Sequence, residues 1–228
     1  MQQQNEPNQI ATTLVGTRRE AFAAILMAAC FMMMRPALAA TWHNLDVSGY
    51  VQPLALHMVD ATTGKPVTAK DFRGKIVLLY LGYTQCPDVC PLTLQNVASV
   101  FNRLGKRAEN VRLLFVTVDP HRDTLAVLKE YTRAFSPFFI GLRGNANEIA
   151  QLARRYRLAY SVTPASSGHP YTVTHSSAIY VFDRDGNPKL LIDSMASSQP
   201  DIAGTAEDLS KLLSASEPGL LARLSAML

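Results

Sequence analysis

Cysteine is scarce in this chain, which has three cysteines among 228 residues. Cys30 lies inside an apolar N-terminal run, so only Cys86 and Cys90 stand in the remaining sequence. Two thiols form one disulfide at most, and such pairs can oxidise outside the cytosol. The scarcity therefore excludes a disulfide-rich scaffold and directs attention to this single pair.

An excess of charge of one sign is lacking as well. The chain has 22 lysines and arginines against 18 aspartates and glutamates, a formal net charge of +4. So mild a surplus argues against a nucleic-acid partner.

Methionine is scarce beyond residue 34, where Met58, Met195 and Met227 remain. A methionine-rich site for a soft metal is therefore excluded.

The N-terminal apolar run, residues 21–34, falls short of the roughly twenty residues that span a bilayer as a helix. Arg18 and Arg19 precede it, and the small-residue segment 37–40 follows it. This order is typical of a secretory signal peptide with an A-x-A cleavage site. We expect residues 1–40 to be a signal peptide and the protein to be exported to the periplasm. The alternative is an uncleaved anchor that holds the protein at the inner membrane, facing the periplasm.

Residues 41–228 are long enough for one domain with a sizeable core. Apolar runs predict strands at residues 76–81, 111–118, 138–142, 177–182 and 188–192. Helical periodicity predicts helices at residues 91–104, 124–135 and 147–156, and a last helix capped by Asp201. The polar stretch 159–174 is expected to be a loop. This order of elements predicts an α/β domain with a thioredoxin-like fold, a central mixed sheet flanked by helices.

The two remaining cysteines stand between the first predicted central strand and its helix. Pro91 follows Cys90 directly, so we expect the helix to begin at Pro91 with Cys90 as its cap. Free amides at a helix start favour thiolate, which predicts a lowered pKa for the nearby thiols. Three residues separate Cys86 from Cys90, whereas two are typical of redox motifs. The pair alone is compatible with metal binding, redox exchange or a structural disulfide.

A third ligand decides between these uses. His175 comes shortly before the predicted strand 177–182. If that strand runs antiparallel beside strand 76–81, its start lies next to the end of the other strand, and His175 approaches the cysteine turn. Two sulfurs and one imidazole suit copper, as Cu(I) or Cu(II), whereas structural zinc usually has four protein ligands. We therefore expect Cys86, Cys90 and His175 to bind copper.

The other candidate residues have simpler explanations. Ordinary surface or core roles are expected for His43, His57, His121 and His169, although His121 and His169 are rivals of His175 as a ligand. Asp119 ends the second central strand at the same edge of the sheet, so we expect it to orient a metal ligand without binding the metal itself. Asp123 is expected to cap the helix that follows it.

Three motifs resemble one known family. They are residues 82–91 (GYTQCPDVCP), Val118-Asp119-Pro120 with Arg122-Asp123-Thr124, and Thr174-His175-Ser176. Together they resemble the Sco/SenC family, copper chaperones that serve the assembly of the binuclear copper centre of cytochrome c oxidase. The resemblance covers residues 54–213. It implies a thioredoxin-like fold, copper ligation by Cys86, Cys90 and His175, and a partner such as the copper-site subunit of the oxidase or another copper protein. Members of that family usually keep an N-terminal membrane anchor, from which the cleavage site in this chain departs.

The main alternative function is an exported thiol-disulfide oxidoreductase that reduces the cysteines of a copper-accepting protein. Residues 71–75 (DFRGK) also resemble exported thioredoxin-like reductases and peroxidases, and two thiols can cycle through a disulfide. Such enzymes have closer cysteine spacing and need no histidine at position 175. We therefore expect a metallochaperone rather than an enzyme. A third hypothesis is a redox or copper sensor that acts only by binding a partner.

Overall fold

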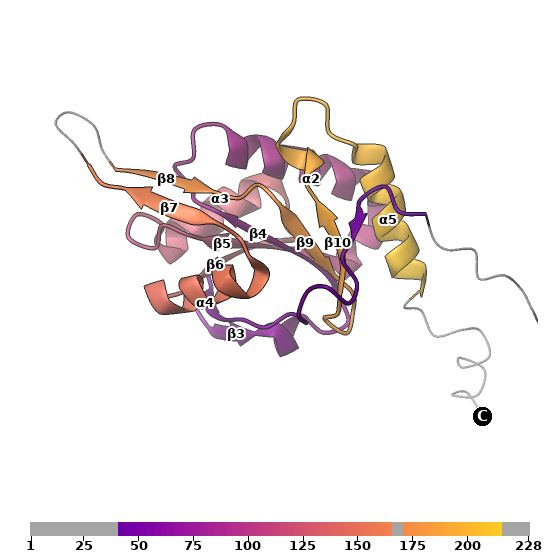
Figure 1. Cartoon of the computed structure of the whole chain (residues 1–228), viewed down its shortest axis with the longest axis horizontal. Coiled ribbons are helices and arrows are strands. Elements are labelled where there is room, and N and C mark those ends of the chain that lie inside the picture. Colours follow the sequence, from indigo (N-terminus) through magenta and orange to yellow (C-terminus); the bar gives the residue numbers. More distant parts are fainter. Residues whose placement is uncertain (1–40, 166–170, 216–228) are drawn as a thin grey trace, which may run out of the picture. The chain divides into compact units, whose positions relative to one another are not determined.

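The structure, a computed structural model, describes residues 41–165 and 171–215. Its main element is an eight-stranded mixed sheet with the strand order β1-β10-β9-β4-β5-β6-β2-β3 (Figure 1). The strands of this sheet are β1 (Leu45–Asp46), β2 (His57–Asp60), β3 (Pro66–Thr68), β4 (Ile76–Gly82), β5 (Val111–Thr117), β6 (Phe139–Arg143), β9 (Ile179–Phe182) and β10 (Pro188–Ile192). The fold is thioredoxin-like, as the element order predicted.

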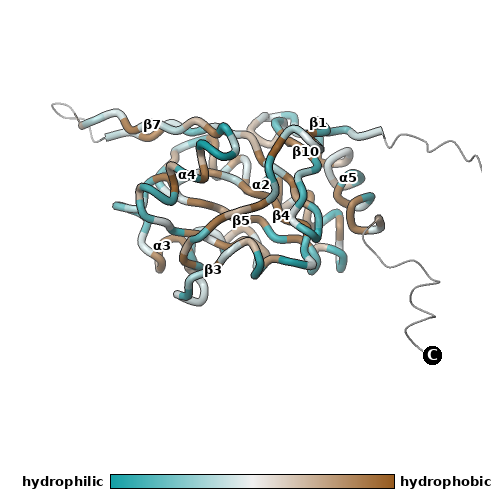
Figure 2. Tube along the Cα trace, turned by 60° about the horizontal axis from the view of Figure 1, so that its bottom comes forward, coloured by the Kyte–Doolittle hydropathy of each residue, from teal (hydrophilic) through white to brown (hydrophobic). Residues whose placement is uncertain are grey.

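Strands β4 and β5 form the centre of the sheet because their residues are apolar toward both faces. All seven residues of β4 are buried. Strand β5 pairs with β4 in parallel, from Ile76 opposite Val111 to Gly82 opposite Thr117, and β9 runs antiparallel along the other side of β4. Figure 2 shows the hydrophobic stretch of β5 running through the interior. A strand covered on both faces lacks polar alternation, which is why the sequence predicted both central strands.

Helices cover both faces of the sheet. They are α2 (Val89–Leu104), α3 (Leu125–Phe135), α4 (Ala146–Tyr156) and α5 (Ile202–Ala215), with short 3-10 helices at Ala69–Phe72, Gly105–Asn110 and Ser194–Ala196. Leu78 of β4 packs in one core with residues of α2, α3 and α5, such as Leu94, whereas Leu79 packs in the other core with Ile149 of α4. Successive side chains of a strand point to opposite faces, so β4 contributes to both cores.

The start of α2 differs from the prediction. The helix begins at Val89 with Asp88 in the N-cap position, so Cys90 belongs to the first turn and is not the cap. Pro91 is the third residue of the helix. Proline is tolerated there because the first amides of a helix have no carbonyl partner within it. Cys90 is thereby carried by a regular helix and not by a loop.

A second sheet replaces most of the predicted loop at residues 159–174. Strands β7 (Tyr160–Thr163) and β8 (Thr172–His175) form an antiparallel hairpin, which Figure 1 shows in orange beside the main sheet. The loop prediction was wrong because serine and threonine were taken as loop residues, although the β-branched threonine and valine of this segment favour strands. The next strand, β9, accordingly begins at Ile179 instead of residue 177.

The signal peptide or anchor predicted at residues 1–40 lies outside the described residues. Within residues 41–165 and 171–215, no helix is both long and apolar enough to cross a membrane.

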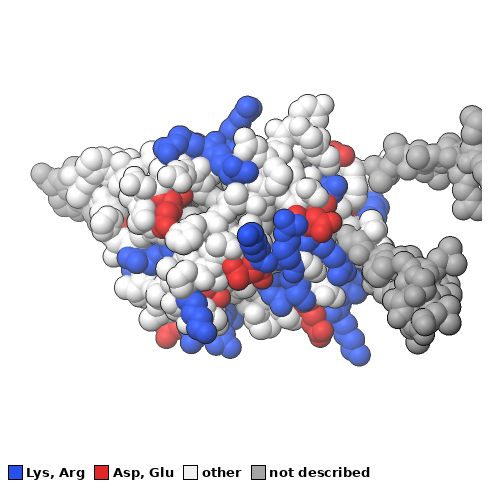
Figure 3. All heavy atoms as spheres, turned by 90° about the horizontal axis from the view of Figure 1, so that it is seen from below, with Lys and Arg blue, Asp and Glu red and all other residues white. Residues whose placement is uncertain are grey.

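On the face shown in Figure 3, acidic side chains lie between the basic ones.

Candidate metal centre

The loop between β4 and α2 carries Cys86 and is fastened to the end of β5. Thr84 donates to the carboxylate of Asp123 through its backbone amide (3.0 Å) and its hydroxyl (2.6 Å). Asp123 is fully buried and also accepts from Oγ1 of Thr117 (2.6 Å). The expectation that Asp123 caps α3 was wrong, since Thr124 is the cap. The buried carboxylate instead ties the cysteine loop to the sheet.

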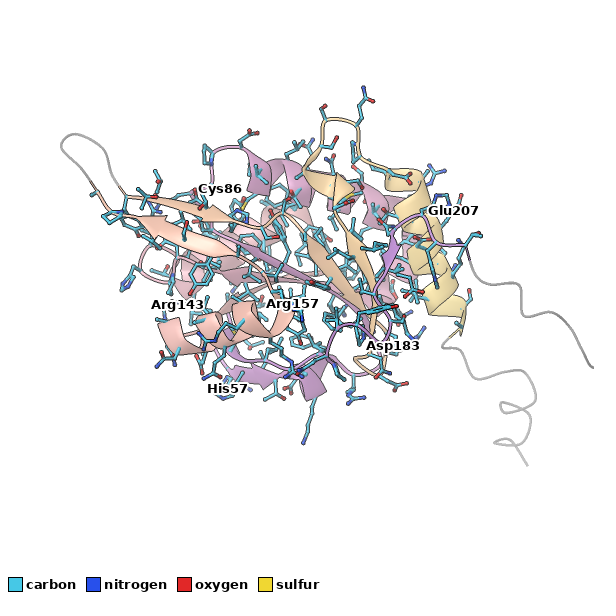
Figure 4. All side chains as sticks on the ribbon, in the orientation of Figure 1. His57, Cys86, Arg143, Arg157, Asp183 and Glu207 are labelled. Carbon is cyan, nitrogen blue, oxygen red and sulfur yellow. The ribbon has the colours of Figure 1, made fainter. Side chains whose placement is uncertain are left out.

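The two sulfurs lie close together at the start of α2. Cys90 is fully buried, and Cys86 is partly exposed. The backbone amide of Cys90 donates to Sγ of Cys86 at 3.4 Å, and both cysteines are free thiols. Figure 4 shows Cys86 at the opposite end of the sheet from Asp183, which lies in the turn after β9. The pair therefore sits at the end of the sheet where the carboxyl ends of β4 and β5 meet.

His175 completes the group. It is the last residue of β8, and its Nε2 lies 3.1 Å from Sγ of Cys90. The ligand atoms of Cys86, Cys90 and His175 all lie within 4.8 Å of one another. The antiparallel pairing of β9 with β4 that was predicted is present, and the three residues converge as expected. The hairpin, however, and not the start of a sheet strand, carries the imidazole.

The imidazole is oriented with one nitrogen free for a metal. Nδ1 lies 3.0 Å from the carbonyl oxygen of Ser176, which can only accept a hydrogen bond. Nδ1 therefore carries the proton, and Nε2 turns its lone pair toward the sulfurs. The rings of Tyr80 and Tyr83 pack edge-on against the imidazole, with centroids at 5.9 and 5.8 Å. Neither tyrosine was predicted from the sequence, although Tyr83 is the first residue after β4 and stands three residues before Cys86.

Burial disfavours the charged forms of Cys90 and His175 in the metal-free site. It raises the pKa of Cys90 to about 12, although the hydroxyl of Tyr80, 3.7 Å from the sulfur, acts in the opposite direction. Burial also lowers the pKa of His175. The prediction that the helix start lowers the thiol pKa was wrong for Cys90, because the loss of hydration outweighs the free amides of the first turn. At neutral pH Cys90 is therefore a thiol beside a neutral imidazole.

Copper binding is expected to strengthen as pH rises, by about tenfold per pH unit for each proton released on binding. Cys90 must lose its proton to bind, and its pKa of about 12 predicts no plateau at mildly alkaline pH. Competition with a chelator of known protonation constants, repeated at several pH values, would measure the slope. An affinity that does not change with pH would mean that Cys90 is not a ligand.

The other histidines lie elsewhere. Nε2 of His43 is 3.1 Å from Glu207, and Nδ1 of His57 is 2.7 Å from Glu148. His121 is exposed, and His169 lies outside the described residues. Among the residues that the structure describes, His175 is the histidine that joins the cysteine pair.

Asp119 makes no hydrogen bond to Cys86, Cys90 or His175 among the described residues. Its carboxylate, 3% exposed, accepts from Nε of Arg122 and from the hydroxyl of Tyr171 (2.7 Å). Tyr171 immediately precedes β8, the strand that ends at His175. Asp119 therefore contacts the hairpin and not one of these three side chains, and its supporting role stays a prediction.

Known proteins share both the sequence and the fold. A model of the SCO1/SenC family matches residues 57–213. The mitochondrial SCO2 homolog of Bos taurus is 46% identical over 118 residues, which are 51% of this chain and 44% of that protein. The mitochondrial SCO1 homolog of Homo sapiens is 37% identical over 126 residues, 54% of this chain and 42% of that protein. The chain thus spans about half the length of the curated relatives it matches.

Solved structures match over almost their whole length. ScoI of Bradyrhizobium japonicum, solved with copper bound, is 37% identical with a TM-score of 0.62; the match covers 70% of this chain and 98% of that one. Yeast Sco1 with copper bound is 30% identical with a TM-score of 0.62, over 74% of this chain and 92% of that one. Since the family model spans most of the chain and these relatives share its fold, the chain belongs to the SCO1/SenC family.

Proposed function

We propose that this protein binds one copper ion through Cys86, Cys90 and His175 and delivers it to another protein. The observation that carries the proposal is the convergence of two sulfurs and one imidazole nitrogen within 4.8 Å. The proposed acceptor is the copper-site subunit of cytochrome c oxidase, during assembly of the binuclear copper centre. The copper bound in the two solved relatives supports the choice of metal.

The donor atoms suit copper in type and in spacing. Soft sulfur ligands select Cu(I), imidazole also suits Cu(II), and structural zinc usually has a fourth protein ligand. Metal bonds of about 2.0 to 2.3 Å hold neighbouring ligand atoms roughly 3.5 Å apart. Nε2 of His175 lies 3.1 Å from Sγ of Cys90, so the imidazole needs only a small outward shift to admit the ion.

Exposure of one sulfur supports transfer over storage. Cys90 is fully buried, whereas Cys86 is partly exposed at the loop. An acceptor thiolate or imidazole can therefore reach the metal beside Cys86 while Cys90 still holds it. Exchange through such shared coordination avoids releasing the ion into solution.

The proposed location is outside the cytosol, in the periplasm or facing it from the inner membrane. Export is supported by the leader-like pattern at residues 1–40, in which two arginines precede an apolar run and small residues follow it. The proposal includes membrane association through the N-terminus if this leader is retained.

Transfer of copper is expected when the loaded protein meets a soluble, metal-free copper-site domain of cytochrome c oxidase. Optical absorption of the acceptor centre would follow the gain of copper, and metal analysis after separation would follow the loss from this protein. The same protein oxidised to the Cys86–Cys90 disulfide is the control, because its sulfurs cannot form the thiolates that bind the metal. Copper that stays with the reduced protein would contradict the delivery role.

Thiol-disulfide exchange is the second candidate, and one observation favours it. The two sulfurs lie within 4.8 Å of each other and are reduced, so a modest movement would join them. The burial of Cys90 and its pKa of about 12 disfavour rapid attack by that sulfur, since the thiolate is the nucleophile. Exchange would therefore begin at Cys86.

A further inference from the structure

His175 belongs to a hairpin whose two described strands do not pair with the main sheet. Among the described residues, β7 and β8 pair with each other and with no strand of the eight-stranded sheet. The amide of Ser176 closes the base of the hairpin by donating to the carbonyl of Ala159 at 2.8 Å. A two-stranded hairpin is only marginally stable alone. Contacts of its side chains with the body of the protein must therefore set where His175 lies.

One polar cluster makes such a contact. We define the Asp119–Arg122–Tyr171 cluster by the hydrogen bonds from Arg122 and Tyr171 to the carboxylate of Asp119. The guanidinium of Arg122 also lies over the ring of Tyr171, 3.9 Å from its centroid. Asp119 and Arg122 belong to the segment after β5. Tyr171 immediately precedes β8, the strand of the hairpin that ends at His175. The cluster thus joins the hairpin to the central sheet.

The same cluster reaches the wall of the metal site. The guanidinium of Arg122 lies 5.7 Å from the ring centroid of Tyr83. Tyr83 packs edge-on against His175, with the ring planes at 88°. Arg122 therefore lies between a tyrosine of the hairpin and a tyrosine of the cysteine loop. This one side chain thus contacts both the hairpin that carries His175 and the loop that carries Cys86.

We propose that Asp119, Arg122 and Tyr171 are positioning residues that hold His175 at the metal and thereby set the rate of copper release. The proposal rests on the proposed copper site. When the cluster is intact, the hairpin keeps the imidazole beside the two sulfurs. When it opens, His175 leaves first and the copper stays on Cys86 and Cys90, ready for an acceptor.

Tyr171→Phe is the sharpest test, because it removes the hydroxyl bonded to Asp119 and keeps the ring under Arg122. Release of copper from the loaded full chain to excess chelator is expected to be about two- to tenfold faster, the effect of one such hydrogen bond. One copper per chain should remain bound before release. Tyr50→Phe is the matched control, since Tyr50 is 88% exposed, and it should release copper at the wild-type rate.

A double-variant cycle shows whether the effect acts through the imidazole. In a His175→Ala background, Tyr171→Phe is expected to change the release rate no further. Equal acceleration in both backgrounds, or a wild-type rate for Tyr171→Phe alone, would overturn the positioning role. Failure of the copper site itself is distinguishable, because His175→Ala would then release copper at the wild-type rate.

Discussion

Replacing His175 with alanine is expected to lower copper affinity by at least about 100-fold. Losing a hydrogen-bond partner behind a metal ligand already costs about 10- to 100-fold, so losing the ligand should cost more. The change removes the nitrogen that lies 3.1 Å from Sγ of Cys90 and leaves two sulfurs to hold the ion. Competition with a Cu(I) chelator measures the affinity, and metal analysis after dialysis measures how much copper remains.

His121→Ala is the matched control for this experiment. His121 follows β5 at the same edge of the sheet but is exposed and lies outside the cluster of ligand atoms. Its removal should leave affinity and stoichiometry as in the wild type. Wild-type affinity and one bound copper in His175→Ala would contradict the three-ligand site.

The ligand variants also separate the two candidate functions. Cys86→Ser and Cys90→Ser should each abolish both copper binding and disulfide exchange, because both processes need both sulfurs. His175→Ala should bind copper at least about 100-fold more weakly while keeping exchange with a model disulfide, since no step of exchange uses the imidazole. Exchange that is lost together with copper affinity in His175→Ala would instead give the histidine a role in thiol chemistry.

Gly82→Ala is expected to destabilise the protein by about 1 to 3 kcal/mol and to weaken copper binding at the same time. A Cβ at this position would stand 2.5 Å from Cε2 of Phe115 and 2.9 Å from Sγ of Cys90. Both neighbours are fully buried, so neither can move aside freely. Denaturant unfolding of the metal-free protein gives the loss of stability, and chelator competition gives the loss of affinity.

Gly141→Ala is the control that separates packing from metal binding. A Cβ at Gly141, in strand β6 on the other side of β5, would meet Leu128 at 3.0 Å and would contact neither cysteine. We expect it to cost stability while copper affinity stays unchanged. The account of Gly82 would be wrong if its alanine variant kept wild-type stability, or if it lost stability while copper affinity stayed as in the wild type.

Elements with a strong local pattern were predictable from the sequence. The continuous apolar runs of β4 and β5 and the helical stripe of α2 lie within one or two residues of their predicted bounds. The short strands β1, β2 and β3 were not predicted, and β7 and β8 were taken as loop. These five strands are two to four residues long, too short for periodicity to distinguish them from loops.

Side-chain environments were less predictable than elements. The helix start near Cys90 argued for a lowered thiol pKa, whereas the folded protein raises it to about 12 by burial. Asp123 resembled a helix cap in the sequence, yet it is buried against Thr84 and Thr117. In each case residues distant in sequence supply the surroundings that decide the outcome.

The sequence by itself determined the chemistry that is available, namely two sulfurs in one turn, an imidazole ahead of a strand, and the apolar runs that build a covered sheet. Only the tertiary structure decided how closely His175 meets the sulfurs, that Cys90 rests as an uncharged thiol, and that a hairpin in contact with Asp119 and Arg122 through Tyr171 carries the imidazole. The physical reason is that propensity and periodicity act between near neighbours in the chain. Ligand distances, burial and hydrogen-bond networks arise between segments that only folding brings together.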